Sequence, residues 1–352
     1  MASVLDKLAF EAGQAARIGW FFGQKMLARR LTRPMPVPER LRGRPVPDRR
    51  RLLADLWRLL EQDWRNIETG LYLPPDDWRG NPLDAVRRAV DFFADLRAVD
   101  ALRHGERAGR RLDPPEEGRY PPYYLQKFHF QSDGYLSAAS AERYDYQVEI
   151  LFGGGAAAMR RQALVPLRQA LINHPGGAAR ARLLDIGCGT GMLLREVKRN
   201  HPRLAVTGLD LSAPYLDVAR RRLADWSGVE LLTAPAEAMP LPDAGFDIVT
   251  CVYLMHELPP AVRGAVAAEI RRVLKPGGTL VLVDSLQLGD EPDYDATLEW
   301  FPVAFHEPYY DGYVRADLDR LMGPDLAPVD RRTAYFSKVL TYRRKSPASH
   351  NI

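Results

Sequence analysis

Cysteine is nearly absent from this sequence, which holds only Cys188 and Cys251 among its 352 residues. Two thiols cannot form a disulfide framework or, by themselves, a four-ligand metal site, so we expect a reducing, cytoplasmic setting. The sequence also lacks any uncharged apolar run near the roughly 18 residues that a membrane-spanning helix needs. With 46% hydrophobic and 27% charged residues, the composition indicates a globular protein that does not cross a membrane.

Patterns that would mark a metal centre are missing as well. The sequence contains no HExxH motif, no cluster of cysteine and histidine, and no acidic triad at ligand spacing. Chemistry that depends on a protein-bound metal is therefore disfavoured, and we expect no metal site.

The excess of positive charge is confined to the start of the chain. The net charge is +4, but residues 1–51 carry twelve basic and four acidic residues, whereas the other 301 residues carry 37 basic and 41 acidic ones. A nucleic-acid-binding body would be basic throughout. Because the body of this chain is mildly acidic, we do not expect a nucleic-acid partner.

Residues 3–31 have apolar side chains at helical spacing, Val4, Leu5 and Leu8 among them, with basic residues between them, which predicts a basic amphipathic helix with a buried apolar stripe. Asp6 and Glu11 argue against a cleaved signal peptide. The aromatic residues 20–22 beside the cationic face suit contact of residues 1–31 with an anionic membrane surface, or with a partner protein. The alternative is that this helix packs against the protein's own body.

Residues 33–48 contain five prolines and four arginines, which predicts an extended, solvated linker. We therefore expect three regions. Residues 1–50 form the helix and linker, residues 51–150 form a helical and aromatic-rich lid or substrate-binding region, and residues 151–345 form an α/β domain. The polar and aromatic residues 123–142 are the expected lid or pocket wall.

The chemistry is concentrated in residues 181–191, ARLLDIGCGTG. A short apolar strand ends at Asp185, and the glycines Gly187, Gly189 and Gly191 follow at a spacing of two before an apolar helix. Glycines allow a ligand to approach the backbone at the carboxyl edge of a parallel strand. A pyrophosphate-binding turn has the spacing G-x-G-x-x-G, so this turn indicates a different cofactor.

A second strand, residues 204–209, ends at Asp210, whose carboxylate can accept hydrogen bonds from both hydroxyls of a ribose. Taken alone, Asp210 could also be a helix cap or turn residue. Further strands are expected at 229–233, 248–253, 279–283, 329–336 and 338–343. Residues 275–278, Lys-Pro-Gly-Gly, predict a tight turn into the strand at 279–283, and residues 313–322 predict a helix. The pattern predicts an α/β fold, a Rossmann-like seven-stranded doubly wound sheet with an N-terminal, mainly helical extension.

The succession LLDIGCGTG, GLDLS, AEAMPLPDAGFD and LKPGG resembles the class I S-adenosylmethionine (SAM)-dependent methyltransferases, particularly the ubiquinone/menaquinone-type C-methyltransferases. The resemblance covers about residues 180–285. It implies SAM as cofactor, S-adenosylhomocysteine as its product, and no metal. It also implies cofactor-binding roles for Asp185, Gly187, Cys188, Gly189 and Gly191 at the amino-acid end, Asp210 at the ribose, Leu211, Ala236 and Glu237 at the adenine, and the carbonyl of Cys251 or Val252 at the ammonium group.

The chain departs from the family's pattern at the adenine. Family members often have Gly-Asp-Ala-Glu where this chain has residues 234–237, Ala-Pro-Ala-Glu, and Pro235 cannot replace the aspartate as an acceptor. Either Glu237 or a backbone carbonyl takes that role, or the adenine pocket is more open. From the preceding helix, Tyr144 and Tyr146 either close over the amino-acid end of SAM or are core aromatics.

His256 and His306 are the candidate catalytic residues, because an unperturbed histidine titrates near neutral pH. Each has an alternative role: His256 could only cap backbone groups, and His306 could pack beside the neighbouring tyrosines. Aromatic residues at 120–135 and 300–313 could enclose a small hydrophobic or aromatic acceptor, quinone-, polyketide- or lipid-like, methylated at carbon or oxygen.

Two other functions stay open at this point. A nucleic-acid (RNA) methyltransferase would typically carry Asn/Asp-Pro-Pro-aromatic after the fourth strand, where this chain has residues 253–256, Tyr-Leu-Met-His. The second is a catalytically silent SAM-binding scaffold docked on a membrane, since a fold does not guarantee activity. The sequence makes no prediction of oligomeric state.

Overall fold

The computed structural model describes residues 3–76, 82–105, 112, 118, 120–131 and 133–346. The chain forms two compact units. The first comprises Met1–Met159 with Glu291–Pro308, and the second comprises Arg160–Asp290 with Tyr309–Ile352. Residues 291–308, which we expected in the α/β region, thus cluster with the N-terminal residues. The division of the chain into domains at residues 50 and 150 stays a prediction.

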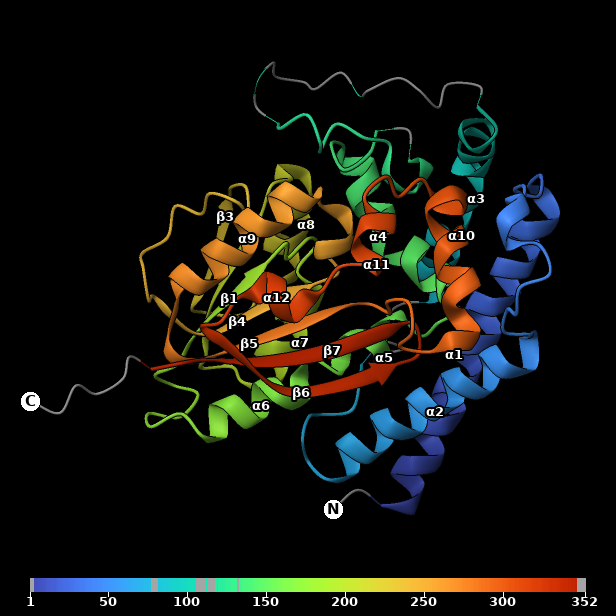
Figure 1. Ribbon diagram of the computed structural model, residues 1–352. Helices are drawn as coiled ribbons and strands as arrows, with labels where there is room; N and C mark the ends of the chain where they lie inside the picture. Colours follow the sequence, from blue (N-terminus) through green and yellow to red (C-terminus); the bar gives the residue numbers. More distant parts are fainter. Residues whose placement is uncertain are drawn as a thin grey trace, which may run out of the picture. The chain divides into compact units, whose positions relative to one another are not determined.

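The second unit is built on one seven-stranded sheet with the order β3-β2-β1-β4-β5-β7-β6 (Figure 1). Neighbouring strands among β1 to β5 pair in parallel, whereas β7 pairs antiparallel with both β5 and β6. The predicted Rossmann-like, seven-stranded fold is confirmed. The strands are β1 Arg182–Ile186, β2 Ala205–Asp210, β3 Val229–Thr233, β4 Phe246–Val252, β5 Leu274–Ser285, β6 Leu326–Ala334 and β7 Ser337–Arg344.

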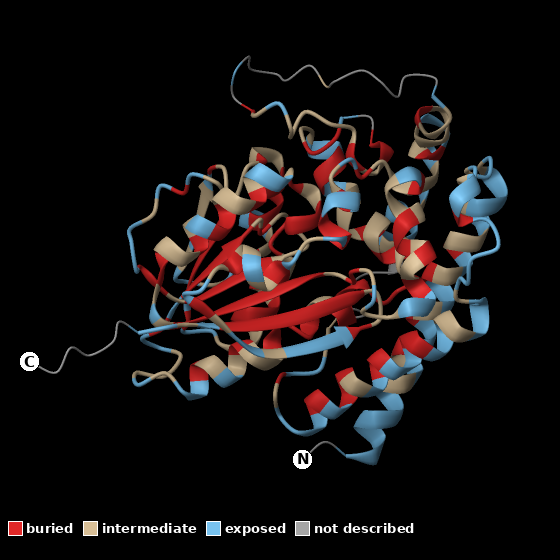
Figure 2. Cartoon of the chain, viewed as in Figure 1, coloured by how far each residue is buried: buried red, intermediate tan, exposed pale blue. Residues whose placement is uncertain are grey.

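The core of this unit lies on both faces of the central strands, which are red in Figure 2. Leu183, Leu184 and Ile186 of β1 are each 0% exposed. Near-continuous apolar runs are what parallel strands covered on both faces require. The helices that connect or cover the strands are α6 Leu164–Ile172, α7 Met192–Asn200, α8 Ala213–Arg222, η3 Met255–Glu257, α9 Pro260–Val273, α11 Tyr310–Val314 and α12 Leu318–Met322.

Two sequence expectations for this unit are wrong. The LKPGG segment is no separate turn before a strand, because β5 begins at Leu274, which pairs with Phe246, and the next paired residue is Thr279. Residues 275–278 bulge out of the ladder between these two pairs. The single helix expected at 313–322 is instead the two short helices α11 and α12.

The first unit is mainly helical within its described residues. The N-terminal helix α1 spans Val4–Leu31 and begins with a capping box between Ser3 and Asp6. The other elements are η1 Glu39–Leu41, α2 Arg49–Glu68, α3 Pro82–Arg103, η2 Phe128–Phe130, α4 Ala138–Leu151, η4 Pro292–Tyr294 and α10 Asp295–Phe305. Helix α5, Ala156–Arg161, spans the chain junction between the two units.

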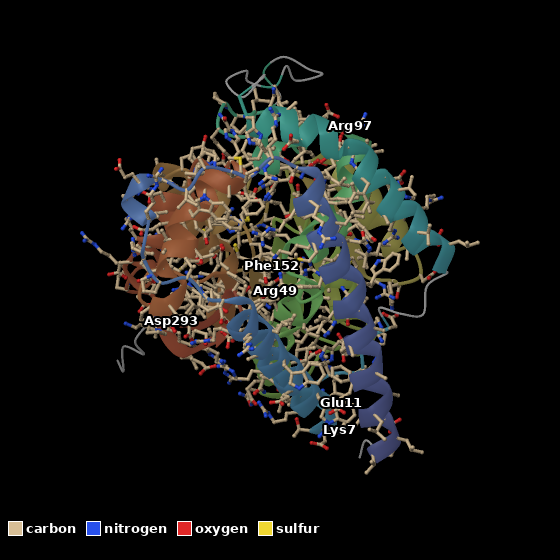
Figure 3. All side chains as sticks on the ribbon, turned by 90° about the vertical axis from the view of Figure 1, so that its right-hand side faces the viewer. Lys7, Glu11, Arg49, Arg97, Phe152 and Asp293 are labelled. Carbon is tan, nitrogen blue, oxygen red and sulfur yellow. The ribbon has the colours of Figure 1, made fainter. Side chains whose placement is uncertain are left out.

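Helix α1 packs against its own unit, through a face that the sequence pattern did not predict. Val4, Leu5 and Leu8, which we placed on the apolar stripe, are 76%, 76% and 55% exposed. The buried residues of α1 are Gln14, Arg17, Phe21 and Gln24. Figure 3 shows Lys7 and Glu11, which form an i,i+4 ion pair, on the side of α1 that faces α2, where the Phe10 ring lies 5.3 Å from the ring of Trp64. Contact of α1 with a membrane or partner stays a prediction.

Helix α4 provides the partners of the buried face of α1. The Arg17 Nη2 atom lies 2.6 Å from Glu149 Oε1. Trp20 Nε1 and Gln24 Nε2 both donate to the Tyr146 hydroxyl, at 2.9 and 2.7 Å. Tyr146 is 6% exposed and packs with Phe21. Of the two roles that the sequence left open for Tyr146, it therefore has that of a core aromatic residue.

The linker prediction for residues 33–48 is only half right. Most of the segment has no regular structure, but Leu41 in η1 is buried. Arg33 pairs with Asp100 of α3 at 2.8 Å, and the Pro36 carbonyl accepts from Trp300 Nε1 of α10 at 3.2 Å. Side chains far away in the sequence therefore fix this segment. Across the described part of the chain, none of the helices combines the length and apolar character needed to span a bilayer.

Candidate active site

The glycine turn follows β1 and folds back against β2. The N–H groups of Gly187 and Cys188 both donate to the Leu209 carbonyl, at 2.8 and 3.0 Å. Gly191 has a φ of 77°, and a Cβ there would lie 3.1 Å from the Ala219 Cβ of α8. Only glycine combines this left-handed backbone with such close packing. The turn therefore presents bare backbone at the carboxyl edge of the sheet.

Asp210, at the end of β2, ties the glycine turn to the start of α8. Its Oδ2 accepts from the Gly189 N–H and its Oδ1 from the Ser212 N–H, both at 2.8 Å. Burial raises the pKa of Asp210 to about 6, and the Glu257 carboxylate of η3 adds to this shift. Asp210 therefore has the structural role that the sequence left open, that of a turn residue. It is also a carboxylate at the edge of the sheet where we expect a ligand to bind.

Asp185, at the end of β1, is a second buried carboxyl group at this edge. Its side chain is 2% exposed and its Oδ1 accepts from the Thr250 hydroxyl of β4 at 2.6 Å. Burial raises its pKa to about 7, and the charge of Asp210 contributes to the shift. A bound positive charge would stabilise the ionised forms of these two buried carboxyl groups, so this edge of the sheet favours a cationic ligand.

The segment after β3 lies beside Asp210 through the backbone, since the Ala234 N–H donates to the Asp210 carbonyl at 3.1 Å. Its turn is closed by the Ala238 N–H, which donates to the Pro235 carbonyl at 3.3 Å. This turn carries Ala236 and Glu237, and Leu211 directly follows Asp210. Their predicted contacts with adenine remain predictions.

Both cysteines lie at this edge of the sheet and both are free thiols. Cys188 is 8% exposed and Cys251 is 0% exposed. Burial raises the pKa of each thiol well above its ordinary value. Since the thiolate is the nucleophilic form, neither side chain is suited to nucleophilic catalysis. The cofactor contacts predicted for Cys188 and for the Cys251 carbonyl would therefore be made by the backbone.

His256 lies in η3, directly after β4, and is 8% exposed. Its ring does more than cap backbone groups, because Nδ1 lies 2.5 Å from Oδ1 of Asp284 at the end of β5. The same loop approaches the glycine turn, since a Cβ on Gly187 would lie 3.3 Å from the Leu254 side chain. The structure therefore brings together Asp185, the glycine turn, Asp210 and His256.

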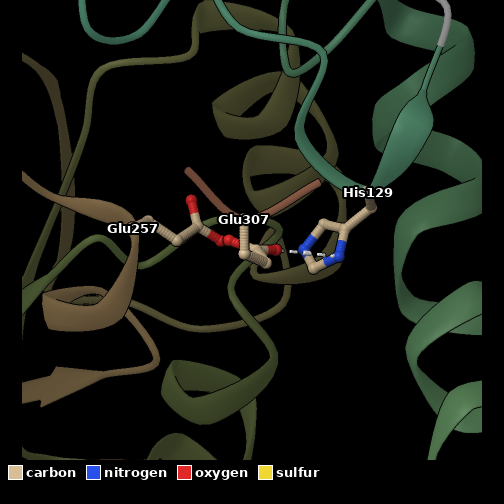
Figure 4. A group of neighbouring side chains, drawn as sticks. All are labelled: His129, Glu257 and Glu307. Carbon is tan, nitrogen blue, oxygen red and sulfur yellow. Dashed lines mark ion pairs between the residues drawn. The ribbon is translucent and has the colours of Figure 1, made fainter. Parts of the chain in front are cut away.

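His306 and Tyr144 belong to the first unit and are described there. His306 ends α10 with a φ of 50°, and its ring lies 5.5 Å from that of Phe130. Burial lowers the pKa of His306. The next residue, Glu307, is 0% exposed and its Oε1 lies 3.1 Å from His129 Nδ1 (Figure 4). Tyr144 lies on α4 with its ring 5.8 Å from that of Tyr135. The proposed roles of His306 and Tyr144 stay predictions.

Sequence reasoning missed Asp284 and Thr250. The signal for Asp284 was present, because it ends the apolar strand β5 just as Asp185 and Asp210 end β1 and β2. The partner Thr250 has no comparable signal, since threonine is common in strands and nothing local marks its contact with Asp185.

The sheet order, with β1 between β2 and β4 and the glycine turn at this switch point, defines a Rossmann-like cofactor-binding domain. Residues 183–278 match the family model of a methyltransferase domain. The demethylmenaquinone methyltransferase of Deinococcus radiodurans is 34% identical over 150 residues, 42% of this chain and 58% of that protein. The chain is thus similar to class I SAM-dependent methyltransferases of the ubiquinone/menaquinone type, and the predicted resemblance is confirmed.

Other similar proteins have related names. The ubiquinone/menaquinone biosynthesis C-methyltransferase UbiE of Desulfotalea psychrophila is 34% identical over 147 residues, 42% of this chain and 55% of that protein. The chain therefore spans somewhat more than half the length of these curated relatives. A solved SAM-dependent methyltransferase from Aquifex aeolicus is 16% identical, with 59% of this chain and 99% of that chain covered and a TM-score of 0.42.

Proposed function

We propose that this protein is a SAM-dependent methyltransferase that acts on a small hydrophobic or aromatic acceptor and releases S-adenosylhomocysteine. The observation that carries the proposal is the Asp210 carboxylate, held by two backbone N–H groups at the mouth of a glycine turn. A carboxylate in this place can accept from both hydroxyls of a ribose. The matching family model and the named relatives support the same activity.

The residues at this edge fit SAM as cofactor. SAM supplies an electrophilic methyl group on a sulfonium, and it also carries an ammonium group, so it brings positive charge. Asp185 and Asp210 favour a cation, because a bound positive charge stabilises the ionised forms of two carboxyl groups whose pKa values burial raises. The chain's contribution to the rate is then chiefly proximity and alignment of the acceptor, with a group that takes up its proton.

For the acceptor we propose a quinone-, polyketide- or lipid-like molecule methylated at carbon or oxygen. Support comes from the relatives, which are named for demethylmenaquinone and for ubiquinone/menaquinone biosynthesis. The aromatic side chains around 120–135 and 300–313 suit such a molecule. His256 and His306 are the proposed proton acceptors. No metal is needed for this reaction. We also propose that the protein is cytoplasmic and that residues 1–31 contact a membrane surface or a partner protein.

Calorimetry with SAM and S-adenosylhomocysteine tests the site. Asp210→Ala should weaken SAM binding by about 100-fold or more, because two charge-assisted hydrogen bonds at about 1.5–3 kcal/mol each are lost. Asp217→Ala is the matched control, since Asp217 lies on the neighbouring helix α8 with its side chain 61% exposed. Undiminished binding by Asp210→Ala in a folded protein would contradict the site assignment.

Turnover tests the activity separately. Purified protein, SAM and an extract of hydrophobic metabolites are incubated, and untargeted mass spectrometry searches for products heavier by one CH₂ group. Appearance of such a product, lost in Asp210→Ala and retained in Asp217→Ala, identifies the acceptor and supports the proposal. Tight SAM binding without a methylated product in any extract would favour the silent scaffold instead.

A further inference from the structure

Helix α1 has its polar side buried and its apolar side exposed to solvent. Its buried residues include Gln14, Arg17 and Gln24. The ion pair of Arg17 with Glu149, together with the hydrogen bonds to Tyr146, fixes this orientation. In a helix that only faces water, the polar side would be the exposed one. Between residues 8 and 28, none of the exposed positions carries a charged side chain; they are Leu8, Ala9, Ala12, Ala15, Ala16, Gly19, Trp20, Gly23 and Leu27.

The fold of the single chain does not require the two glycines on this face, Gly19 and Gly23. Both lie inside the helix without a left-handed backbone, and a Cβ at either position would meet no atom of the described chain within 4 Å. Glycine destabilises a helix interior relative to alanine, because it loses more backbone freedom on folding. Two glycines one turn apart are favoured where a second helix backbone comes close. Their presence therefore indicates a partner helix.

One row of exposed positions, spaced by three and four residues, has the same order of side-chain size from either end of the helix. Two leucines lie at its ends and four small residues lie between them, in the order Leu8, Ala12, Ala16, Gly19, Gly23 and Leu27. Two antiparallel copies of this helix can therefore place small residues against small residues and leucine against leucine. Small residues on both sides allow the two helix axes to approach to about 8 Å.

The charges at the two ends of α1 favour the antiparallel arrangement. Its first turn carries Asp6, and its last turn carries Arg29 and Arg30, all of them exposed. An antiparallel pair brings the acidic first turn of one copy near the basic last turn of the other, and it also opposes the two helix dipoles. A parallel pair would bring the arginines of both copies together. A lipid surface would gain nothing from Gly19 and Gly23, because glycine has no apolar side chain to insert.

We propose that this exposed face of α1 binds the same face of a second copy of the chain, with the two helices antiparallel. The inference narrows the contact proposed for residues 1–31 to one partner, so it rests on that part of the proposed function. A strip as long as α1, about 42 Å, and about 10 Å wide covers roughly 800 Å² on the two copies together, at the lower limit for specific interfaces. The dimer is therefore reversible, with a Kd in the micromolar range.

Sedimentation velocity of the full chain, from about 1 to about 100 µM protein, tests the dimer. The wild-type mass should rise from that of a monomer to twice that value. Gly19→Leu should weaken dimerisation by about tenfold or more, because the added side chain separates the two helix axes. As a monomer, the same variant should melt about 2 °C higher, because leucine favours a helix over glycine. Gly264→Leu in α9 is the matched control, since a Cβ there also meets nothing within 4 Å. It should dimerise like the wild type.

Three results would overturn the proposal. The first is a wild-type protein that stays monomeric at the highest concentration, and the second is a folded Gly19→Leu variant that dimerises as tightly as the wild type. The third is a monomeric wild-type protein that floats with vesicles of phosphatidylglycerol and phosphatidylcholine, which would mean that this face binds lipid. None of these measurements depends on SAM, so a protein without methyltransferase activity can still confirm the dimer, and a monomer can still be a methyltransferase.

Cysteine cross-linking tests the direction of pairing. Both native thiols, Cys188 and Cys251, are buried, so a short bismaleimide reacts chiefly with an introduced cysteine. A mixture of Leu8→Cys and Leu27→Cys proteins should give a covalent dimer on a denaturing gel, whereas either variant alone should run as a monomer. Cross-linking of Leu8→Cys with itself would contradict the antiparallel arrangement. The absence of a covalent dimer from the mixture, at a concentration where it sediments as a dimer, would place the interface elsewhere and overturn the proposal.

Discussion

The ion pair between Arg17 and Glu149 should be the strongest single tie between α1 and the rest of the first unit. Both side chains are 9% exposed, and Arg17 Nη2 lies 2.6 Å from Glu149 Oε1. Arg17 Nε also donates to the Gly154 carbonyl at 3.0 Å, and Glu149 Oε1 accepts from the Ala157 N–H at 2.9 Å. Arg17→Met keeps most of the side-chain volume but leaves a buried carboxylate without its cation.

Loss of one partner from a buried pair costs about 3–5 kcal/mol in the free energy of unfolding. Urea unfolding, followed by circular dichroism and tryptophan fluorescence, measures this cost. Arg30→Met is the matched control, because Arg30 lies exposed in the last turn of the same helix and should cost less than about 0.5 kcal/mol. The double variant Arg17→Met with Glu149→Gln should recover much of the loss.

Two outcomes would refute this reasoning. In the first, Arg17→Met unfolds at the same urea concentration as Arg30→Met. In the second, the Arg17→Met and Glu149→Gln costs are simply additive, which would mean that the two charges do not stabilise each other. Either result would indicate that α1 contributes little to the stability of the first unit, as expected for a helix that binds a membrane instead.

Two further predictions concern the second unit. Since burial raises the pKa of Asp185 to about 7 and of Asp210 to about 6, the folded chain holds protons that the unfolded chain releases, and the ligand-free free energy of unfolding should fall as pH rises from about 4 to about 7. Asp185→Asn should flatten this slope in urea titrations, and an unchanged slope would contradict it. Lys198 Nζ donates to three carbonyls, at 2.7, 2.7 and 2.9 Å, and is 0% exposed, so Lys198→Met should destabilise by about 3 kcal/mol or more. A thermal melt within a degree or two of wild type would show that these bonds contribute nothing net.

The alternation of strands and helices in the second unit was predictable because its signals are local. Strands β1, β2 and β4 are short and mostly apolar, and Asp185 and Asp210 at the ends of β1 and β2, with the glycines that follow β1, mark the carboxyl edge. Asp185, Asp210 and His256 meet there because the ends of parallel strands share one edge of the sheet. Sequence reasoning therefore found most of the second unit's candidate site, apart from Asp284 and Thr250.

The contacts of α1 could not be predicted in the same way. Hydrophobic periodicity marks Val4, Leu5 and Leu8 as a buried face, yet the buried positions include Arg17 and Gln24. Polar side chains can be buried only when a partner satisfies them, and Glu149 and Tyr146 lie more than a hundred residues away in the chain. Such pairings depend on tertiary structure, which periodicity does not encode.

The bulge in β5 shows the same limit. Pro276, Gly277 and Gly278 predict a turn by composition, but the ladder resumes in the same direction after four residues because Leu274 and Thr279 both pair with β4. Lys275 Nζ stabilises the bulge through Asp247 Oδ1 at 2.8 Å. Composition located the irregularity and could not reveal that the strand continues through it.

The place of β7 between β5 and β6 has a consequence for biosynthesis. The outer edge of β5 is covered by Ser337–Arg344, so it stays open until some 60 further residues have been added to the nascent chain. At about 5–20 residues per second this delay lasts roughly 3–12 s. During that time the apolar residues 280–283, which are 0% exposed in the folded unit, form an unpaired strand edge. Ribosome pausing or truncation before Arg344 should therefore make this chain prone to aggregation even when all the residues of the proposed cofactor site are already present.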